Sequence, residues 1–333
     1  MIDVCVIGCG DRGRVHAAEW GKRSDARVIA VCDVQTDRME ALAAATGARP
    51  YADWRQAVSH DGIQVVSVCV PTSLHAEMTC FAADEGRHVF AEKPLALTVD
   101  DGLRMLESAR RNDIVYMPCF QYRDEPINRY FRDCFGAGAF GGPTTFRFSD
   151  IREVRPKTVM HSRSVNGGVL IDMACHIFDL MRWITGCEPV RIYAAGHVFG
   201  RGKQHLAGIR DLAIDEATVE LTMEDGHQLQ MYLNWGMPEG FPQVETEHAM
   251  LGPNLYLRRA AGSSVHRVTA AGFESLPLDP GPGTTARIDR FVRVLRGEEP
   301  ADVTGADALE ALRLSLAALE SIETGRAVDL TAG

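Results

Sequence analysis

A glycine-rich turn near the amino terminus constrains the fold more than any other feature of this chain. The apolar run Ile2–Ile7 leads directly into Gly8-Cys9-Gly10-Asp11-Arg12-Gly13, and an amphipathic stretch follows. A strand, a glycine turn and a helix in this order predict a parallel βαβ unit whose helix amino terminus binds the phosphates of a dinucleotide. Gly8 permits the tight turn, Gly10 lets the backbone approach a pyrophosphate, and Gly13 lets the helix pack closely on the strand. A simple glycine-rich turn without a ligand would show the same pattern.

Asp33 favours a dinucleotide-binding turn over a simple glycine-rich turn, and it also indicates the type of cofactor. It lies twenty residues after Gly13, at the end of the apolar run Val28–Cys32. A carboxylate at this position accepts hydrogen bonds from the adenosine ribose hydroxyls and repels a 2′-phosphate, so NAD is favoured over NADP. Arg12 and Arg38 keep NADP open as the alternative, because a nearby arginine can receive the phosphate. Arg38 could equally be an exposed helix residue.

Length and composition limit the classes of protein. A chain of 333 residues with 46% hydrophobic residues is expected to form about two domains, which we place at residues 1–120 and 121–333. The formal charge of -10 argues against nucleic acid or an anionic membrane as the main partner. Nine cysteines without a Cys-x-x-Cys pair indicate neither a disulfide framework nor a zinc ribbon. No apolar run approaches the roughly 18 residues of a membrane span, and we expect a cytoplasmic protein.

The first part of the chain alternates between short apolar runs and amphipathic stretches, which is typical of βαβ units around a doubly wound parallel sheet. We expect strands at Val4–Ile7, Val28–Cys32, Val65–Val70, Val89–Ala91 and Val115–Met117, and helices at Arg14–Lys22, Asp37–Thr46, Ala76–Glu85 and Val99–Arg110. These elements predict an α/β amino-terminal domain of the Rossmann type.

The pattern changes after Phe120 to an α+β arrangement. We expect helices at Pro126–Cys134 and Gly168–Thr185, and strands at Thr144–Phe148, Val190–His197, Ala217–Met223, Gln228–Asn234, Glu245–Leu251, Leu255–Arg258 and Val265–Thr269. Consecutive strands with short turns favour a largely antiparallel sheet. After a linker at residues 279–283, the helices Ala286–Leu295 and Ala306–Thr324 close the chain.

Three residues in two separated segments could carry proton-transfer chemistry. Lys93 lies in Glu92-Lys93-Pro94, and Asp172 and His176 lie four residues apart in the expected helix Gly168–Thr185, where they would share a face. A neutral imidazole can accept the hydroxyl proton of an alcohol that loses a hydride, and a lysine can stabilise the charge that develops on the oxygen. An isolated Asp/His pair would more often be structural.

Asp179 continues the same helix stripe, either as a partner of the imidazole or as a surface carboxylate. The series Asp-x-x-x-His-x-x-Asp has no further ligand cluster of convincing spacing, so no metal site is predicted.

Together, these motifs resemble the glucose–fructose oxidoreductase/inositol dehydrogenase/MocA family over nearly the whole length. The likeness includes the glycine turn, Pro71-Thr72-Ser73-Leu74-His75, the Glu92-Lys93-Pro94 segment and the Gly167–His176 segment. The resemblance implies a Rossmann domain, an open-faced sheet domain that builds homodimers or homotetramers, and oxidation of sugars or cyclitols. It implies that Lys93, Asp172 and His176 are catalytic. With the turn analysis, the expected cofactor contacts are Gly8, Gly10, Asp11, Arg12, Gly13, Asp33, Arg38, Pro71, Thr72, His75, Glu92 and Lys93.

Five residues are candidate substrate contacts: Gln121, Arg123, Arg152, Arg163 and Trp235. The first two could face a substrate or simply start a helix. The basic segment 152–163 would suit an anionic substrate such as a uronate, phosphate or sulfonate, although a solvated or subunit-interface loop is the favoured interpretation. Trp235 could stack on a sugar ring or pack in the core.

The leading functional hypothesis is an NAD-dependent dehydrogenase that oxidises a secondary ring alcohol of a sugar, sugar derivative or cyclitol, with His176 as the base. A second hypothesis is an NAD-dependent glycosidase that oxidises C3 transiently, eliminates the aglycone and ends without net NADH. A third is a catalytically silent, cofactor-sensing regulator, which the presence of Lys93, Asp172 and His176 disfavours.

Overall fold

The computed structural model describes residues 1–241, 246–261, 263–279 and 284–331. The chain divides into two compact units: unit 1 holds residues 1–120 and 284–309, and unit 2 holds residues 121–283 and 310–333. Most of the expected linker 279–283, and the first residue of the strand expected at 245–251, lie outside the described residues.

The centre of unit 1 is a parallel sheet of six strands in the order β3-β2-β1-β4-β5-β6, counted over the described residues. Its strands are β1 Ile2–Ile7, β2 Ala26–Cys32, β3 Arg49–Tyr51, β4 Val65–Val68, β5 His88–Ala91 and β6 Tyr116–Pro118. The inner strands β4 and β1 are apolar and almost wholly buried, because helices cover both faces of such a sheet. The strand order reverses between β1 and β4, and ligands bind parallel α/β sheets at such a switch point.

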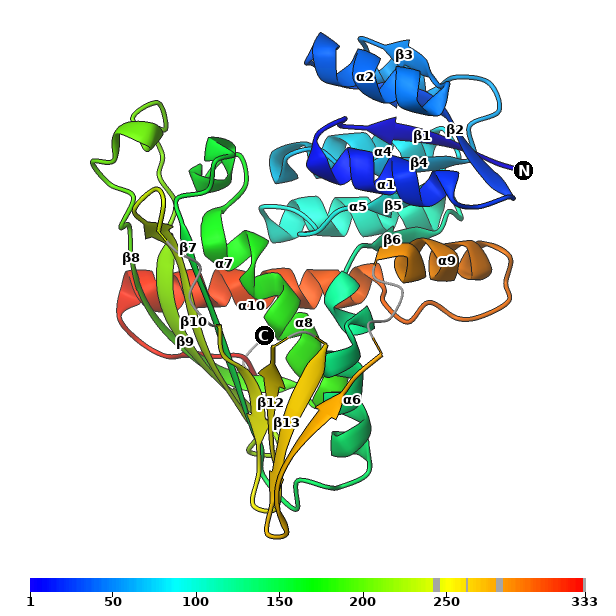
Figure 1. Ribbon diagram of the computed structural model, residues 1–333. Coiled ribbons are helices and arrows are strands. Elements are labelled where there is room, and N and C mark those ends of the chain that lie inside the picture. Colours follow the sequence, from blue (N-terminus) through cyan, green and yellow to red (C-terminus); the bar gives the residue numbers. More distant parts are fainter. Residues whose placement is uncertain (242–245, 262, 280–283, 332–333) are drawn as a thin grey trace. The chain divides into compact units, whose positions relative to one another are not determined.

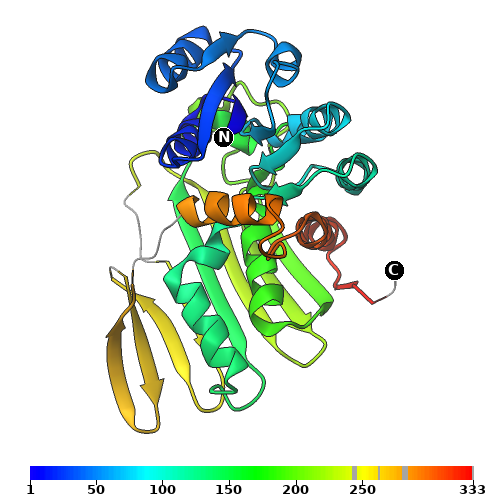
Figure 2. The same ribbon diagram turned by 90° about the vertical axis from the view of Figure 1, so that its right-hand side faces the viewer.

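The helices of unit 1 form two groups. They are α1 Asp11–Gly21, α2 Thr36–Thr46, α3 Trp54–Val58, α4 His75–Asp84, α5 Val99–Arg111 and α9 Thr284–Leu295. Helix α1 contacts α2 and α9, whereas α4 contacts α5. Figure 2 shows the dark blue α1 and the cyan helices on opposite sides of the sheet. The arrangement confirms the expected doubly wound fold.

Residues 284–309 return to unit 1, although the sequence places them with residues 121–283. The cause is aromatic packing and charge. Phe291 is fully buried, with its ring 6.2 Å from Trp20 and 5.3 Å from Phe90. Arg23 of this unit pairs with Asp289. Helix α10 Gly305–Thr324 contributes its first five residues to unit 1 and the remainder to unit 2.

Unit 2 is built on a sheet of nine strands in the order β14-β13-β12-β11-β7-β10-β9-β8-β15, counted over the described residues. The strands are β7 Thr145–Glu153, β8 Pro189–His197, β9 Glu216–Met223, β10 Gln228–Met237, β11 His248–Leu251, β12 Tyr256–Ala260, β13 Ser264–Thr269, β14 Gly272–Pro277 and β15 Val328–Asp329. Among the described strands of this sheet, only β7 and β10 pair in parallel, so the sheet is largely antiparallel, as expected.

One face of this sheet is covered by the helices α6 Pro126–Gly136 and α8 Ala174–Thr185, with the short α7 Gly168–Asp172 ahead of α8. Figure 1 shows α6 and α8 along the same face, and the two helices contact each other. Phe131 of α6 lies edge-on against Phe146 of β7 at 6.1 Å, and both rings are fully buried. The apolar core therefore lies between these helices and the sheet.

Three strands and one α-helix of the described residues were not predicted from the sequence: β3, β14, β15 and α3. Strand β3 has three residues and includes Pro50, so it shows no apolar alternation. Strand β14 lies at a sheet edge and is mostly exposed, so it has no buried face to detect. All nine cysteines lie in the described residues and none forms a disulfide. Among the described helices, none is long and apolar enough to cross a bilayer.

Candidate functional site

The glycine turn between β1 and α1 is tightly packed at two positions and open at the third. A Cβ on Gly8, whose φ is 90°, would lie 2.4 Å from the carbonyl oxygen of Cys69, and a Cβ on Gly13 would lie 1.7 Å from that of Gly8. No side chain fits at either. A Cβ on Gly10 would meet nothing nearer than the Arg38 Nη1 at 3.9 Å. Gly10 is also the N-cap of α1 and provides no side-chain cap, which leaves the first N–H groups of α1 able to bind phosphate oxygens.

Asp33 lies at the end of β2 and contacts this turn. Its Oδ2 accepts a hydrogen bond from the backbone N–H of Cys9 at 2.6 Å, and its Oδ1 accepts one from the N–H of Gln35 at 2.8 Å. Each carboxylate oxygen has a second lone pair, so the group can still accept ribose hydroxyls. Asp33 therefore fixes the turn by its hydrogen bond to Cys9.

The two side chains at the start of α1 behave differently from each other. The carboxylate of Asp11 is exposed and pairs with Arg14 at 2.5 Å. Arg12 points its Nε at the Glu92 carboxylate at 2.5 Å, and its Nη2 is buried without a hydrogen-bond partner among the described residues. Because Arg12 is paired with Glu92, Arg38 is the better placed of the two arginines to receive a 2′-phosphate.

The loop that follows β4 is fastened by His75. Pro71 precedes the short helix η1 Thr72–Leu74, and Thr72 is buried. The His75 Nδ1 lies 2.8 Å from the carbonyl oxygen of Pro94, and its Nε2 lies 3.0 Å from that of Val70. Burial lowers the pKa of His75, against the opposing effect of these carbonyls. The side chain joins the loop after β4 to the loop after β5, so its direct contacts are structural.

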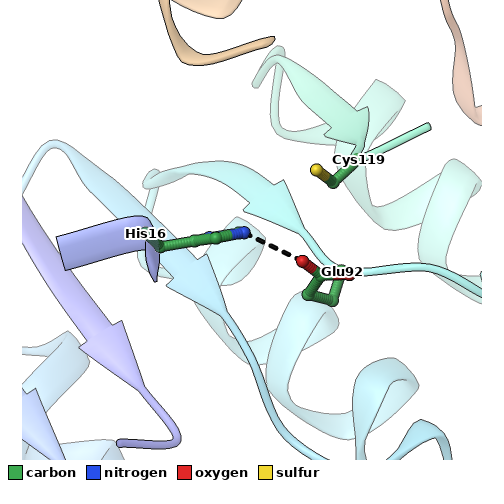
Figure 3. A group of neighbouring side chains, drawn as sticks. All are labelled: His16, Glu92 and Cys119. Carbon is green, nitrogen blue, oxygen red and sulfur yellow. Dashed lines mark hydrogen bonds and ion pairs between the residues drawn. The ribbon is translucent and has the colours of Figure 1, made fainter. Parts of the chain in front are cut away.

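Glu92 directly follows β5 and is the centre of a buried network (Figure 3). Its Oε1 lies 3.1 Å from the His16 Nε2 and 2.5 Å from the Arg12 Nε, and the His16 Nδ1 lies 3.2 Å from the Cys69 Sγ. Burial alone would raise the pKa of Glu92. The hydrogen bond and the charge of His16, followed by the charges of Arg12 and Lys93, outweigh burial and hold that pKa well below its ordinary value.

His16, Glu92 and Cys119 also raise the question of a metal. All three are buried, and their donor atoms lie within 4.8 Å of one another. However, the Arg12 guanidinium already pairs with the Glu92 carboxylate, and the charge of Lys93 acts on the same group. A metal ion would have to displace or tolerate these cations. We therefore interpret the cluster as a hydrogen-bond network.

In unit 2, the expected helix Gly168–Thr185 is two helices, and the break lies between the two candidate catalytic residues. Helix α7 ends at Asp172 and α8 begins at Ala174. The N–H of His176 donates to the carbonyl of Met173 at 3.2 Å, while the carbonyl of Asp172 accepts the Cys175 thiol at 3.3 Å. The bond that would continue a regular helix from residue 172 to residue 176 is thus replaced. The expectation of one continuous helix at Gly168–Thr185 was wrong.

The His176 ring is held by a residue that the sequence analysis missed. His176 is buried in the first turn of α8, and the Tyr122 ring stacks on it with centroids 4.3 Å apart and planes 10° from parallel. The Tyr122 hydroxyl reaches the Met173 Sδ at 4.0 Å. Tyr122 therefore spans the helix break and fixes the imidazole plane. Gln121 begins the same short helix, η2 Gln121–Asp124, and is half-buried.

Arg123 and Asp179 form a buried ion pair, so each of these charged side chains has its partner in the other. The Arg123 Nε lies 2.8 Å from the Asp179 Oδ2, and its Nη2 lies 2.5 Å from the Oδ1. Their side chains are 4% and 1% exposed. The structure therefore does not support Arg123 as a substrate contact, and Asp179 pairs with Arg123. The sequence could not show this pairing because 56 residues separate the two.

 Trp235 forms a second network with Asp150 and Arg152, two charged residues of β7. The Trp235 side chain is 2% exposed, and its Nε1 donates to the Asp150 Oδ2 at 3.0 Å. The Arg152 Nε occupies the other oxygen of Asp150 at 2.7 Å. Trp235 is therefore a core residue and not a stacking platform for a sugar, and Arg152 is held by an acid of its own strand.

Two further basic residues of the segment 152–163 differ in exposure. Arg163 is 64% exposed and lies 3.8 Å from Glu323, which is a weak surface pair. Arg155 lies over the Trp235 ring at 5.3 Å. Burial and the charge of Arg152 lower the pKa of Arg155, while the charges of Asp150 and Asp172 oppose that shift. The negative charge of Asp172 thus acts on Arg155, which was not among the expected contacts.

His161 anchors the loop that carries these residues. It is 1% exposed, and its Nε2 accepts the backbone N–H of Arg155 at 3.0 Å. The buried Asp215 lies 3.8 Å from its Nδ1. Burial, together with the positive charges of Arg155, His205 and Lys203, lowers the pKa of His161 to about 4. The imidazole is therefore neutral near pH 7.

His16 and Tyr122 are the site residues that sequence reasoning missed. His16 lies three residues after Gly13 on the buried side of α1, beside Ala17 and Trp20, and a histidine on an apolar helix face was the available signal. Tyr122 gave no comparable signal, because its stacking partner is far away in the sequence. Both residues hold a candidate catalytic segment in place.

Unit 1 fits a dinucleotide on its own geometry. The open backbone at Gly10, the uncapped start of α1 and the carboxylate of Asp33 supply the phosphate and ribose contacts that such a ligand needs. In unit 2, the His176 imidazole is stacked on Tyr122, and Asp172 lies four residues earlier in the sequence.

Comparison with known proteins agrees with this division. Residues 2–120 match the model of an oxidoreductase family with an NAD-binding Rossmann fold, and residues 129–248 match the carboxy-terminal domain of the same GFO/IDH/MocA family. The chain is 27% identical to a myo-inositol 2-dehydrogenase of Thermotoga maritima, covering 98% of this chain and 97% of the relative. It is 25% identical to a 1,5-anhydro-D-fructose reductase of Ensifer adhaerens, covering 95% and 96%.

A solved structure shows the same fold. The aldose-aldose oxidoreductase of Caulobacter crescentus superposes with a TM-score of 0.85 at 21% identity, covering 99% of both chains. The two family matches follow one another along the chain and account for the glycine turn, the Lys93 segment and the helices α7 and α8. This chain therefore belongs to the GFO/IDH/MocA family of NAD-binding oxidoreductases.

Proposed function

We propose that this protein is an NAD-dependent dehydrogenase that oxidises a secondary ring alcohol of a sugar, sugar derivative or cyclitol. The observation that carries the proposal is the fixed imidazole of His176, which is buried and stacked on Tyr122 in the first turn of α8. The relatives named above support the substrate class, since one is named for a cyclitol and another for an anhydro sugar.

Unit 1 supplies the cofactor site in this proposal. The N–H groups at the start of α1 bind the pyrophosphate, Gly10 allows its close approach, and Asp33 accepts the hydroxyls of the adenosine ribose. The bound nicotinamide supplies the hydride acceptor.

His176 is assigned as the general base. A neutral ring nitrogen can take the hydroxyl proton as the carbon loses its hydride, so the oxygen becomes a carbonyl oxygen without building a full negative charge. Tyr122 keeps the ring plane fixed, which reduces the conformational freedom lost on reaching the transition state. Asp172 is assigned to orient the imidazole and to stabilise its protonated form.

Lys93 is assigned as the electrophilic group. Its ammonium would donate to the substrate oxygen and stabilise alkoxide character as the proton leaves. Replacement by alanine should therefore reduce hydride transfer by about two to four orders of magnitude and leave NAD affinity nearly intact.

The direct test is a panel of inositols, other cyclic polyols and aryl glycosides, each incubated with NAD at alkaline pH. NADH formation by absorbance and product analysis are measured together, with His176→Ala as the inactive variant and the exposed Arg110→Ala as the control. A dehydrogenase gives stoichiometric NADH with at least one cyclic polyol. Aglycone release without net NADH would contradict the proposal and establish the redox-neutral glycosidase.

We further propose that the protein acts in the cytoplasm as a homodimer or homotetramer formed through the sheet of unit 2. The sequence has no Cys-x-x-Cys pair and no disulfide is present in the described residues, which suits a reducing compartment, and Tyr193 on β8 and Phe273 on β14 are large exposed residues of that sheet. Light scattering at several protein concentrations tests the assembly. A monomer at every concentration would contradict it.

A further inference from the structure

A continuous hydrogen-bonded chain crosses unit 1 and ends beside Lys93 in the sequence. It begins at Cys69, which follows β4, passes through the His16 ring on α1 and reaches Glu92 after β5, where Arg12 binds the same oxygen (Figure 3 shows His16 and Glu92). His16 is fully buried, and Glu92 is 5% exposed. The chain thus connects the helix of the phosphate turn to the Lys93 segment.

The direction of the hydrogen bond between His16 and Glu92 follows from the carboxylate. The pKa of Glu92 is held well below its ordinary value, so the carboxylate is ionised and can only accept, and the His16 Nε2–H donates to it. On the other side of the ring, the Nδ1 is bonded to the Cys69 thiol, whose pKa is raised well above its ordinary value by burial and by the Glu92 charge.

Cysteine, histidine and glutamate also occur together around activated cysteine nucleophiles, but here their arrangement disfavours the thiolate. A reactive cysteine needs a thiolate, favoured by nearby positive charge and partial exposure. Cys69 is 7% exposed, and the anion of Glu92 acts against its ionisation. The chain therefore serves to hold Glu92, and not to activate Cys69.

We propose that His16 and Glu92 are positioning residues for Lys93: the Cys69–His16–Glu92 chain, closed by Arg12, keeps an anion next to Lys93 and locks the Lys93 segment to helix α1. Lys93 then stays charged and in place when the phosphate turn is occupied. The inference rests on the proposed catalytic role of Lys93 only for its effect on turnover.

The test measures Lys93 itself. Trace acetylation of the whole protein over a pH series, followed by mass spectrometry of the Lys93 peptide, gives the labelling midpoint of that amine without any turnover. Glu92→Gln is expected to move the midpoint down by roughly one pH unit, because a neighbouring anion stabilises the ammonium ion. His16→Leu should move it in the same direction by less. His16→Gln, whose amide can donate in place of Nε2–H, should stay near the wild type.

A matched control removes a different buried hydrogen bond of helix α1. The Trp20 Nε1 on α1 donates to the Ser67 Oγ on β4 at 2.9 Å, so Ser67→Ala disturbs the packing of α1 without touching Glu92. It should leave the Lys93 midpoint unchanged. Thermal melting of each variant checks that unit 1 is folded, and His16→Leu serves as the second test if Glu92→Gln does not fold.

Turnover separates this inference from the function proposed above. If Lys93 is catalytic, His16→Leu should lower kcat more than it raises KM for NAD, whereas Ser67→Ala should change neither. A shifted midpoint with normal turnover supports the chain and removes Lys93 from the mechanism. A wild-type midpoint in both Glu92→Gln and His16→Leu, or the same shift in Ser67→Ala, would overturn the inference whatever the activity.

Discussion

Breaking the Arg123–Asp179 ion pair should destabilise unit 2 strongly. The pair is bidentate and its side chains are 4% and 1% exposed, so removing either partner leaves a charge buried without its counterion. Such a change costs about 3–5 kcal/mol. In a unit of this size, each kcal/mol lowers Tm by roughly 2–4 °C, so Asp179→Ala should lower the Tm of unit 2 by roughly 6–20 °C.

Differential scanning calorimetry on the whole chain, with the transitions of the two units fitted separately, measures this effect. The double variant Arg123→Met/Asp179→Leu should recover most of the loss, because apolar residues of similar volume can replace a buried pair. Exposed Arg163→Ala should leave Tm unchanged. An Arg123→Met enzyme with wild-type stability and a raised KM for substrate would refute the reasoning and restore Arg123 as a substrate contact.

Three further outcomes are expected. The wild type should bind NAD more tightly than NADP by calorimetry, and Asp33→Ala should narrow the gap, since the carboxylate repels a 2′-phosphate; tighter NADP binding by the wild type would contradict this. Gly10→Ala should keep the wild-type Tm and weaken NAD binding, whereas Gly13→Ala should lower Tm, because its Cβ would lie 1.7 Å from the Gly8 carbonyl oxygen. The pKa of His161 is about 4 in the folded protein against about 6.5 when unfolded, so the unfolded state takes up the proton first and stability should fall between pH 6.5 and 4 by at most about 3 kcal/mol. Urea titrations should show a smaller loss over this window in His161→Gln, and an unchanged loss would contradict the assignment.

The fold could be predicted because its signals are local. Strand β1 is a largely buried apolar run, and Gly8 and Gly13 after it leave no space for a Cβ. The other expected strands and helices of both units are present in the described residues with small differences in their bounds, except that the helix expected at Gly168–Thr185 is two helices. Strand β3 and strand β14 gave no such signal, because each is short or exposed at a sheet edge.

The site could be predicted only where a residue's role depends on its neighbours in the sequence. Asp33 and the glycine turn are close together, as hydrogen-bonded neighbours at the ends of β2 and β1, because β1, α1 and β2 are consecutive and β1 pairs with β2. Trp235 was a candidate substrate contact, but its N–H partner Asp150 is 85 residues away. The break at Met173 has no proline or glycine to announce it.

The remaining differences concern partners that only tertiary structure brings together. The Cys175 thiol takes the Asp172 carbonyl that a continuous helix would have used, and Tyr122 stacks on His176 from a separate short helix. No periodicity in the sequence encodes either contact. The sequence therefore pointed to the candidate segments, whereas Tyr122, which stacks on His176, could be found only in the structure.

The most direct test of the account is the pH dependence of kcat/KM for alcohol oxidation in the wild type and in His176→Ala. A base must be unprotonated to accept the hydroxyl proton, so kcat/KM of the wild type should rise with pH through an ionisation of the free enzyme. The account predicts that His176→Ala folds, binds NAD with near wild-type affinity, loses most turnover and no longer shows this ionisation. The same ionisation in a still active His176→Ala enzyme would contradict the account, because the base would then be another group.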